Sequence, residues 1–499
     1  MKRPLVFLSL ALAPVAATAQ TDARVRELDA YVARAVRDWQ APGLAIAVVK
    51  DGRLVFAKGY GVLELGKTAA VDTQTLFAIG STTKAMTTMA LAMLVDEGKV
   101  RWDDPVTKYL PSFQLADPYL THEVTVRDLI THRAGLPNAD FLWAWNDNSS
   151  DEIVRKLRYV EPAYSLRSSF IYQNIMFAVA GQVVAAASGM SWADFLRARI
   201  FRPLGMTRTV ASLAEASRAN NVAAPHDYVN DTIRVIENRA VDPVASAGAI
   251  WSSIADMSKW MRFVLDSGRV DGNALVQTRT FMELVRPQVM VPESGFYPTA
   301  RLTRPHWQTY ALGWFQQDYN GRKVDFHTGS IDGMVAIIGL ILDERLGVYV
   351  LSNRDHVEAR HALMLKTFDL FTNAPPRDWS AELLTLYGGL RAQGIAARKK
   401  FEAERVLNTK PSLALEKYAG TYSDSLHGAR LITMENGKLR MRYSATYGAT
   451  LEHWQYDTFL ARPDQRWVDP DVVTFVIGNG VPLRLEIDGV AFTRVKSVP

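Results

Sequence analysis

The 499-residue sequence contains no cysteine. This absence excludes disulfide bonds, a thiolate nucleophile and a cysteine-ligated zinc site. It also excludes a lipid-modified cysteine behind a signal peptide. The rest of the composition, with 48% hydrophobic and 22% charged residues, is that of a globular protein able to bury a large core.

Three further features are lacking. No apolar run beyond the N-terminus approaches the length of a membrane span. The basic residues are scattered, with only short clusters such as residues 398–400, although the net charge is +5. The nine histidines show no metal-ligand pair at helical spacing, since His356 and His361 are five residues apart. We expect no membrane span in the mature chain, no nucleic-acid partner, no metal and no organic cofactor.

The N-terminus has the pattern of a secretory signal peptide. Lys2 and Arg3 precede a short apolar run over residues 5–17, and Ala17-Thr18-Ala19 has the small-x-small form of a cleavage site. The alternative is a buried N-terminal helix. We expect a signal peptide over residues 1–19 and, given the missing cysteine, a bacterial periplasmic or secreted protein.

The length predicts two or three domains. Apolar strands at 44–49 and 54–57 flank Asp51-Gly52, a hairpin signal, and a second hairpin is expected over 334–352. A helix before the first hairpin and another after it favour an α+β arrangement: an antiparallel sheet flanked by helices, with a helical subdomain. We predict this domain over 20–375, a linker helix over 376–410, and a small all-β barrel over 411–499.

Ser81 and Lys84 form the only Ser-x-x-Lys in the sequence, at the start of a strongly helical run. Residues three apart share one face of a helix, so the lysine amine is expected beside the serine oxygen. A serine hydroxyl needs such a base to act as a nucleophile. The alternative interpretation is a helix N-cap serine followed by a surface lysine.

Two more motifs follow in order: Tyr172-Gln173-Asn174 and His327-Thr328-Gly329. With them, the chain resembles the serine β-lactamase and penicillin-binding-protein superfamily over roughly residues 25–370. Within it, the resemblance is to the branch of class C β-lactamases, D,D-peptidases, D-aminopeptidases and family VIII esterases. Segments typical of that branch are 77–80, 103–106, 109–111, 129–137, 203–206 and 247–250.

The resemblance implies a role for each motif residue. Ser81 would be the nucleophile and Lys84 its base, which requires a lowered lysine pKa. Tyr172 would share proton transfer with Lys84 and protonate the leaving group, unless it is simply a core tyrosine. Asn174 would orient Lys84 and the substrate.

The third motif would form the substrate-binding strand. Gly329 would let the backbone approach the substrate closely, beside Thr328, and the backbone N–H groups of Ser81 and Ser330 would form an oxyanion hole. His327 replaces the lysine usual in class C β-lactamases, which makes efficient β-lactam hydrolysis less expected. We hypothesise that activity depends on pH through His327.

These patterns leave several functions open. The leading one is a secreted serine hydrolase that forms an acyl-enzyme on D-amino-acid-containing peptides or amides, or on small esters. The alternatives are a carboxylesterase with weak β-lactam reactivity, a dedicated class C-like β-lactamase, or a covalent β-lactam or cell-wall sensor with little turnover. The segment 411–499 resembles a lipocalin-like barrel, which could cover the active site, mediate homo-oligomerisation or stabilise the fold. The aromatic cluster of Phe141, Trp143 and Trp145 could line a pocket rim or simply pack.

Overall fold

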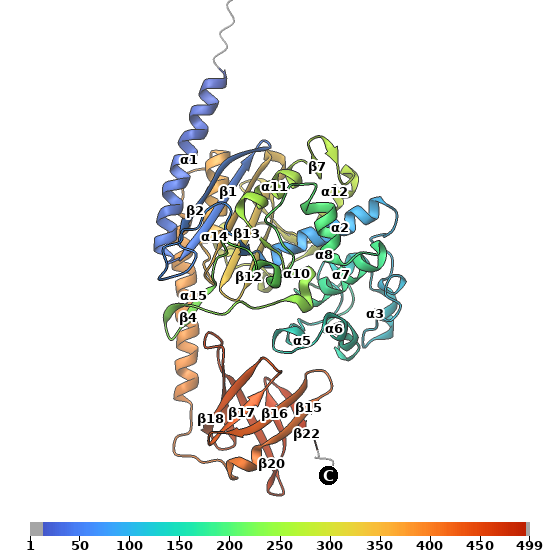
Figure 1. Cartoon of the computed structure of the whole chain (residues 1–499), viewed down its shortest axis with the longest axis vertical. Coiled ribbons are helices and arrows are strands. Elements are labelled where there is room, and N and C mark those ends of the chain that lie inside the picture. The colour runs from blue at the N-terminus through green and yellow to red at the C-terminus, as the bar shows by residue number, and fades with distance from the viewer. Residues whose placement is uncertain (1–12, 496–499) are drawn as a thin grey trace, which may run out of the picture.

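The computed structural model describes residues 13–495, which form an α+β domain, a long helix and a β-barrel (Figure 1). Of the predicted signal peptide, residues 1–12 lie outside the described residues. The first helix, α1 (Ala13–Asp38), begins within the remainder. Asn373 ends another helix, α14 (Ala359–Thr372), in the left-handed conformation.

One antiparallel sheet organises the first domain. Its eight strands lie in the order β2-β1-β14-β13-β12-β11-β10-β9, so the N-terminal hairpin joins strands from the far end of the domain. Both predicted hairpins are present, and Asp51 and Gly52 take positive φ at the first turn. The α+β prediction is therefore confirmed. The strands are β1 (Gly43–Lys50), β2 (Arg53–Gly61), β9 (Val289–Met290), β10 (Gln308–Tyr310), β11 (Phe315–Tyr319), β12 (Arg322–Ile331), β13 (Met334–Ile341) and β14 (Leu346–Ser352).

Successive side chains of β1 enter two different cores, because they alternate between the faces of the sheet. Leu44 and Ile46 pack with α1 and α14, the helices from the beginning and the end of this domain's sequence, which cover one face of the sheet. Ala45 and Ala47 belong to the larger core, on the side of the mostly helical middle of the chain. The small alanine side chains leave room there for α11 (Ile254–Leu265), which contacts β1 and β14.

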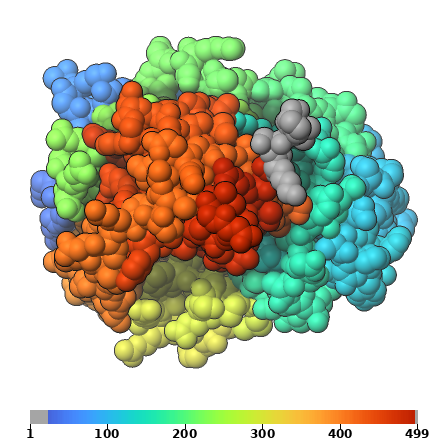
Figure 2. Space-filling model, turned by 90° about the horizontal axis from the view of Figure 1, so that it is seen from below, coloured from blue at the N-terminus to red at the C-terminus, as the bar shows by residue number. Residues whose placement is uncertain are grey.

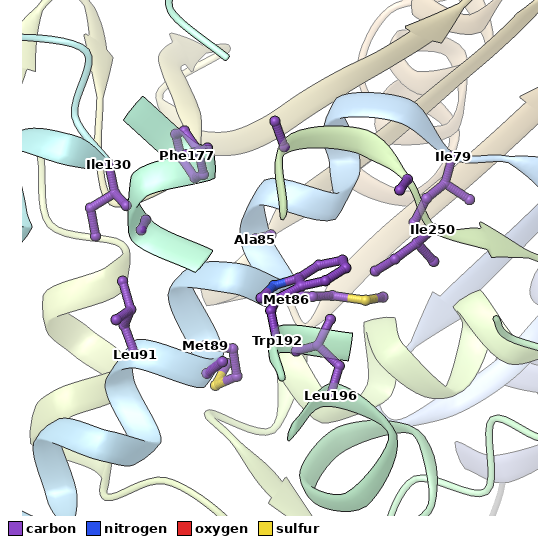
Figure 3. Packing of buried hydrophobic residues seen from close by; sticks show 14 of the residues in the cluster. Ile79, Ala85, Met86, Met89, Leu91, Ile130, Phe177, Trp192, Leu196 and Ile250 are labelled. Carbon is purple, nitrogen blue, oxygen red and sulfur yellow. The ribbon is translucent and has the colours of Figure 1, made fainter. Parts of the chain in front are cut away.

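The larger core is centred on α2 (Thr83–Asp96), a helix that is buried on nearly all sides. Figure 3 shows Met86 and Met89 of α2 near Trp192 and Leu196 of α8 (Trp192–Leu196). The indole Nε1 of Trp192 donates to Thr87 Oγ1 at 2.9 Å, which satisfies both polar groups in the apolar surroundings. This packing fixes the helix that carries the Ser-x-x-Lys residues.

The helical subdomain consists of short elements around α2 and α7 (Ile175–Ser188). Among the described residues, no single helix has the length and apolarity to cross a membrane; α7 and the segment Trp192–Phe201, bent by 72°, meet the criteria only together. The other helices of the domain are α3 (Pro118–Glu123), α4 (Val126–Leu129), α5 (Phe141–Ala144), α6 (Ser150–Lys156), α9 (Leu213–Ala216), α10 (Ala245–Gly248), α12 (Thr278–Leu284) and α13 (Ala300–Thr303). The minor strands are β3 (Phe77–Ala78), β4 (His226–Val229), β5 (Thr232–Val235), β6 (Trp251–Ser252), β7 (Arg269–Val270) and β8 (Asn273–Ala274).

A 25-residue helix, α15 (Trp379–Ala403), runs from the first domain to the barrel (Figure 1). The barrel closes because its first strand pairs with its last, as in Tyr422 with Arg494. Its interior is filled by side chains such as Tyr418, Phe459 and Phe475. Its strands are β15 (Gly420–Asp424), β16 (Gly428–Glu435), β17 (Lys438–Arg442), β18 (Gly448–Gln455), β19 (Thr458–Pro463), β20 (Asp471–Gly478), β21 (Val481–Ile487) and β22 (Val490–Arg494).

Candidate active site

Ser81 lies in a tight turn, Gly80–Thr82, that leads directly into α2. Gly80 begins this turn with a φ of +53°, a conformation that costs glycine little. The turn leaves Ser81 partly exposed, whereas Lys84, one helical turn further on, is fully buried. The Lys84 Nζ lies 2.9 Å from Ser81 Oγ, so the structure brings together the pair that the spacing predicts.

The Lys84 amine also lies 2.7 Å from Asn174 Oδ1 and 3.1 Å from the Ala247 carbonyl oxygen. Burial lowers the pKa of Lys84 from 10.5 to about 7, although the Asp140 carboxylate acts in the opposite direction. A neutral amine has two N–H donors and one lone pair. The two carbonyl-type oxygens can take the donors, which leaves the lone pair for the proton of the Ser81 hydroxyl.

Asn174 connects this lysine to a carboxylate that sequence analysis did not single out. Its Nδ2 donates to Asp140 Oδ2 at 2.8 Å, so its Oδ1 faces Lys84. Trp143 Nε1 donates to the other carboxylate oxygen of Asp140 at 2.9 Å. Asn174 precedes α7 as its N-cap residue without capping it, because its side chain is engaged in this chain of hydrogen bonds.

Tyr172 lies over the same lysine, whose Nζ is 4.8 Å from the centre of the phenol ring. Burial raises the pKa of Tyr172 well above 10, and a hydrogen bond with Ser81 acts against that rise. The phenol therefore keeps its proton at neutral pH. The ring packs 4.3 Å from that of His132, which is buried and accepts a hydrogen bond from the Gln173 amide, consistent with a structural role for His132.

The side chain of His327 is buried on β12, beside these groups. Its Nδ1 lies 2.6 Å from the Thr328 carbonyl oxygen and its Nε2 lies 3.1 Å from the Tyr310 hydroxyl. Burial, with Lys84 nearby, lowers the pKa of His327 from 6.5 to about 3. A pKa this low keeps the imidazole neutral near pH 7, which argues against the hypothesis that activity in that range depends on pH through His327. The Thr328 hydroxyl is likewise engaged, 2.7 Å from that of Tyr297.

Backbone of β12 touches the turn that carries the serine. A Cβ at Gly329 would lie 1.9 Å from the Ile79 carbonyl oxygen and 3.1 Å from the Ser81 nitrogen. A Cβ at Gly80 would lie 2.6 Å from the Ser330 nitrogen. Only glycine fits at both positions. The contact brings the backbone nitrogens of Ser81 and Ser330, which carry the predicted pair of N–H donors, close to each other.

Arg360, on α14, donates hydrogen bonds to the part of β12 that contains Gly329 and Ser330. Its guanidinium donates to the Gly329 carbonyl oxygen at 2.7 Å and to the Ser330 hydroxyl at 3.0 Å. A buried ion pair with Glu358, at 3.0 Å, balances its charge. Sequence analysis missed Arg360 because its partners lie about 30 residues upstream; only the fold shows the connection.

Turns of the barrel lie against the rim of this site. The β15–β16 turn places His427 on Phe141, with ring centres 4.2 Å apart. Trp467, between β19 and β20, donates from Nε1 to Asp332 at 3.2 Å, two residues beyond Ser330. The aromatic cluster left undecided by the sequence thus forms part of this interface. Figure 2 views the molecule from the barrel end. The barrel covers the centre of this view, with a hollow between it and the yellow segment near residue 300.

A second set of contacts holds the barrel at the rim. Trp145 packs on Tyr447 with ring centres 5.3 Å apart. Arg239 lies 4.4 Å from the Trp145 ring and 3.4 Å from Asp332. Among the described residues, no group of three or more histidine, aspartate or glutamate side chains is placed to hold a metal ion.

Comparison with protein families gives two matches. Residues 28–367 match the family described as Beta-lactamase, and residues 404–496 match a family described as Domain of unknown function (DUF3471). Curated relatives include an unguisins hydrolase from Aspergillus violaceofuscus, 28% identical over 87% of this chain and 82% of that protein. Another unguisins hydrolase, from Aspergillus campestris, is 30% identical over 77% of this chain and 73% of that protein.

Solved structures share the fold at lower identity. The octameric penicillin-binding protein homologue from Pyrococcus abyssi is 21% identical, with a TM-score of 0.60 over 95% of this chain and 100% of that one. SurE is 20% identical, with a TM-score of 0.58 over 96% of this chain and 100% of that one. Both matches extend through the barrel, so the two-part architecture is shared.

Proposed function

The chain belongs to the beta-lactamase family and is a serine hydrolase, and from this premise we propose that it cleaves D-amino-acid-containing peptides or amides, or small esters, through an acyl-enzyme on Ser81. One observation carries the proposal: a buried lysine amine with a pKa of about 7 lies 2.9 Å from a partly exposed serine oxygen. A lysine in this state can accept the serine proton at neutral pH.

The residues divide the proton transfers between them. Lys84 takes the Ser81 proton as Oγ bonds to the substrate carbonyl carbon. The oxygen of the tetrahedral intermediate is held by the N–H groups of Ser81 and Ser330, each typically worth about 3 kcal/mol in the transition state. Tyr172, kept protonated by burial, gives its proton to the departing amine or alcohol and recovers one from Lys84. Water then attacks the acyl ester and loses a proton to the same groups, which return it to Ser81 Oγ as the ester bond breaks and the acid is released.

The neutral His327 bears on the choice of substrate. A lysine at this position offers a permanent cation to a substrate carboxylate, whereas a buried imidazole with a pKa of about 3 offers none. This argues against a dedicated β-lactamase, whose substrates carry that carboxylate. The relatives named as unguisins hydrolases support hydrolysis as the reaction class.

The test combines intact-mass measurement with a substrate panel. Wild type and Ser81→Ala are incubated with a D-aminoacyl p-nitroanilide, p-nitrophenyl acetate and benzylpenicillin. We expect turnover of the first or second substrate by wild type alone, and a transient acyl adduct on Ser81 after rapid acid quenching. Rapid hydrolysis of benzylpenicillin would instead identify a β-lactamase, and a stable adduct without turnover a covalent sensor. Equal turnover by Ser81→Ala would overturn the proposal.

We also propose that the protein is exported, on the strength of the signal-peptide pattern over residues 1–19. The test is the N-terminal sequence of protein recovered from the periplasm or medium of a bacterial host. A mature N-terminus at Gln20 supports export with cleavage after Ala19. Retention of the whole sequence in the cytoplasm would contradict it.

A further inference from the structure

A cavity of about 1190 Å³ lies between the first domain, α15 and the barrel, lined by residues outside the Ser81 site. One face of α15 borders it, through Leu384, Tyr387, Arg391, Ile395 and Arg398, which recur at the spacing of a helical face. The rest of the lining includes Trp454 and Leu460 of the barrel and Tyr228 of the first domain. Its volume is somewhat above the range of about 300–1,000 Å³ that is typical of small-ligand sites.

The apolar side chains around this cavity lack cover. Ile395 is 45% exposed, Phe401 40% and Leu407 69%. Phe401 stacks flat on Trp454 with ring centres 5.1 Å apart, which forms an apolar floor where α15 reaches the barrel. Large apolar side chains gathered at one cavity indicate a binding surface more than scattered single ones do.

Two arginines beside Tyr228 give this part of the cavity a positive charge. Arg354 and Arg391 flank the Tyr228 ring, with guanidinium carbons 5.2 Å and 4.0 Å from its centre. Arg354 is 5% exposed, and its Nε has no hydrogen-bond partner among the described residues. Its Nη1 donates to the Tyr228 hydroxyl at 3.4 Å, and the charge of the Asp227 carboxylate acts on the guanidinium. The nearest acid to Arg391 is Asp231, at 3.9 Å on the open surface.

Two further arginines of the cavity are paired with acids. Arg398 pairs with Asp469 at 3.0 Å. Arg462 pairs with Glu452 on the outside of the barrel. Asp227 faces the cavity as well, and burial and the neighbouring Asp355 raise its pKa to about 6, so it is largely ionised at pH 7 and loses its opposition to an anion only as the pH falls below 6. A buried arginine with an unused donor is stabilised when an anionic oxygen accepts a hydrogen bond from it, and the positive charge of the second arginine adds to this preference.

We propose that this cavity binds a soluble medium-chain carboxylate, with its head at Arg354 and Arg391 and its chain along α15 toward Phe401. The backbone of α15 is hydrogen-bonded within the helix, so this wall offers no partners to a peptide main chain. The ten residues between Arg391 and Phe401 span about 15 Å of helix, which suits an extended acyl chain. The proposal does not depend on the chemistry at Ser81.

Titration calorimetry with decanoate and the full-length mature protein tests it. We expect saturable binding of one decanoate per chain, at least tenfold weaker in Arg391→Gln, whose surface position leaves the fold intact. Arg354→Gln should behave alike. Arg462→Gln is the matched control, because it lines the same cavity with its charge already paired, and it should bind as wild type does.

Two further arms test the head and the chain separately. Decyltrimethylammonium, with the same chain and the opposite charge, should not bind. Ile395→Trp should abolish decanoate binding by filling the cavity, while hydrolysis at Ser81 and the melting temperature stay at wild-type values. No binding of decanoate, equal binding of the cation, or unchanged binding in both arginine variants would each overturn the proposal.

Discussion

Asp140 and Lys84 act on each other through a third side chain, the amide of Asn174. That amide donates to the Asp140 carboxylate at 2.8 Å and accepts from the lysine at 2.7 Å. Asp140 thereby fixes which end of the amide faces the lysine. Its negative charge also raises the Lys84 pKa against the larger effect of burial. One carboxylate, outside the three motifs, therefore orients the amide that contacts Lys84 and also raises the pKa of this candidate base.

We predict that Asp140→Asn shifts the pH profile without destroying the site. The asparagine oxygen can still accept from Asn174 or Trp143, but the charge is gone, so the Lys84 pKa should fall below 7. The acidic limb of kcat/KM should move to lower pH, with the plateau rate within about tenfold of wild type. Asp140→Ala, which also releases the Asn174 amide, should lose about 10²-fold at the plateau. An unmoved limb in Asp140→Asn would contradict this role.

The wild-type pH profile should report Lys84. Because the amine acts as a base, it must be unprotonated, so kcat/KM should rise about tenfold per pH unit up to pH 7 and level off above it. His327→Gln tests the assignment: the imidazole is already neutral above pH 4, so its replacement should leave the limb near pH 7 in place. Loss of the acidic limb in His327→Gln would instead show that this limb reports the His327 imidazole. Profiles between pH 5 and 9 decide between them.

Gly329→Ala should damage the site through the backbone. The added methyl group would lie 1.9 Å from the Ile79 carbonyl oxygen, so β12 must separate from the turn that carries Ser81. We expect about 10²-fold lower kcat and a loss of about 1–3 kcal/mol in the free energy of unfolding, measured with urea. Gly388→Ala, where a Cβ meets no atom within 4 Å, is the control. Near-normal kcat in Gly329→Ala would mean that the close contact is dispensable.

Trp467→Phe should separate large substrates from small ones. The change removes the indole N–H that donates to Asp332 and keeps an aromatic ring at this position. The loss of one hydrogen bond to a charged group should change KM for peptide substrates by about tenfold, while p-nitrophenyl acetate, too small to reach the rim, keeps its kinetics. Trp454→Phe, on another part of the barrel, is the control. Parallel changes for both substrates would point to a general loss of stability instead.

Local patterns predicted much of this molecule. The three-residue spacing of Ser81 and Lys84 sets their contact because one turn of helix decides it. The hairpin at Asp51-Gly52 follows from turn residues that tolerate positive φ. The β12 motif was recognised from its resemblance to a family, but the close approach at its glycine is to the turn that carries Ser81, whereas the resemblance implied an approach to the substrate.

Properties that depend on distant segments were not predicted. The His327 pKa is set by burial among side chains such as Tyr310 and Phe315, which come from neighbouring strands. A single motif carries no sign of that burial. Asp140 was missed because its partner Asn174 lies 34 residues further on, and nothing local marks the pair. The barrel's position stayed open because the rim contacts join segments about 300 residues apart, as between Asp147 and Thr446.

The strand order has a consequence for how the chain folds. β1 sits between β2 and β14, with Leu44 opposite Ser352, so one edge of the first hairpin stays unpaired until nearly the whole domain has been made. Pairing between such distant segments is slow, because a long loop must close before any contact rewards it. Unpaired edges of this kind attract other chains. A newly made chain is therefore most prone to aggregate before the N-terminal hairpin pairs with β14, and chaperones that cover this hairpin should raise its yield.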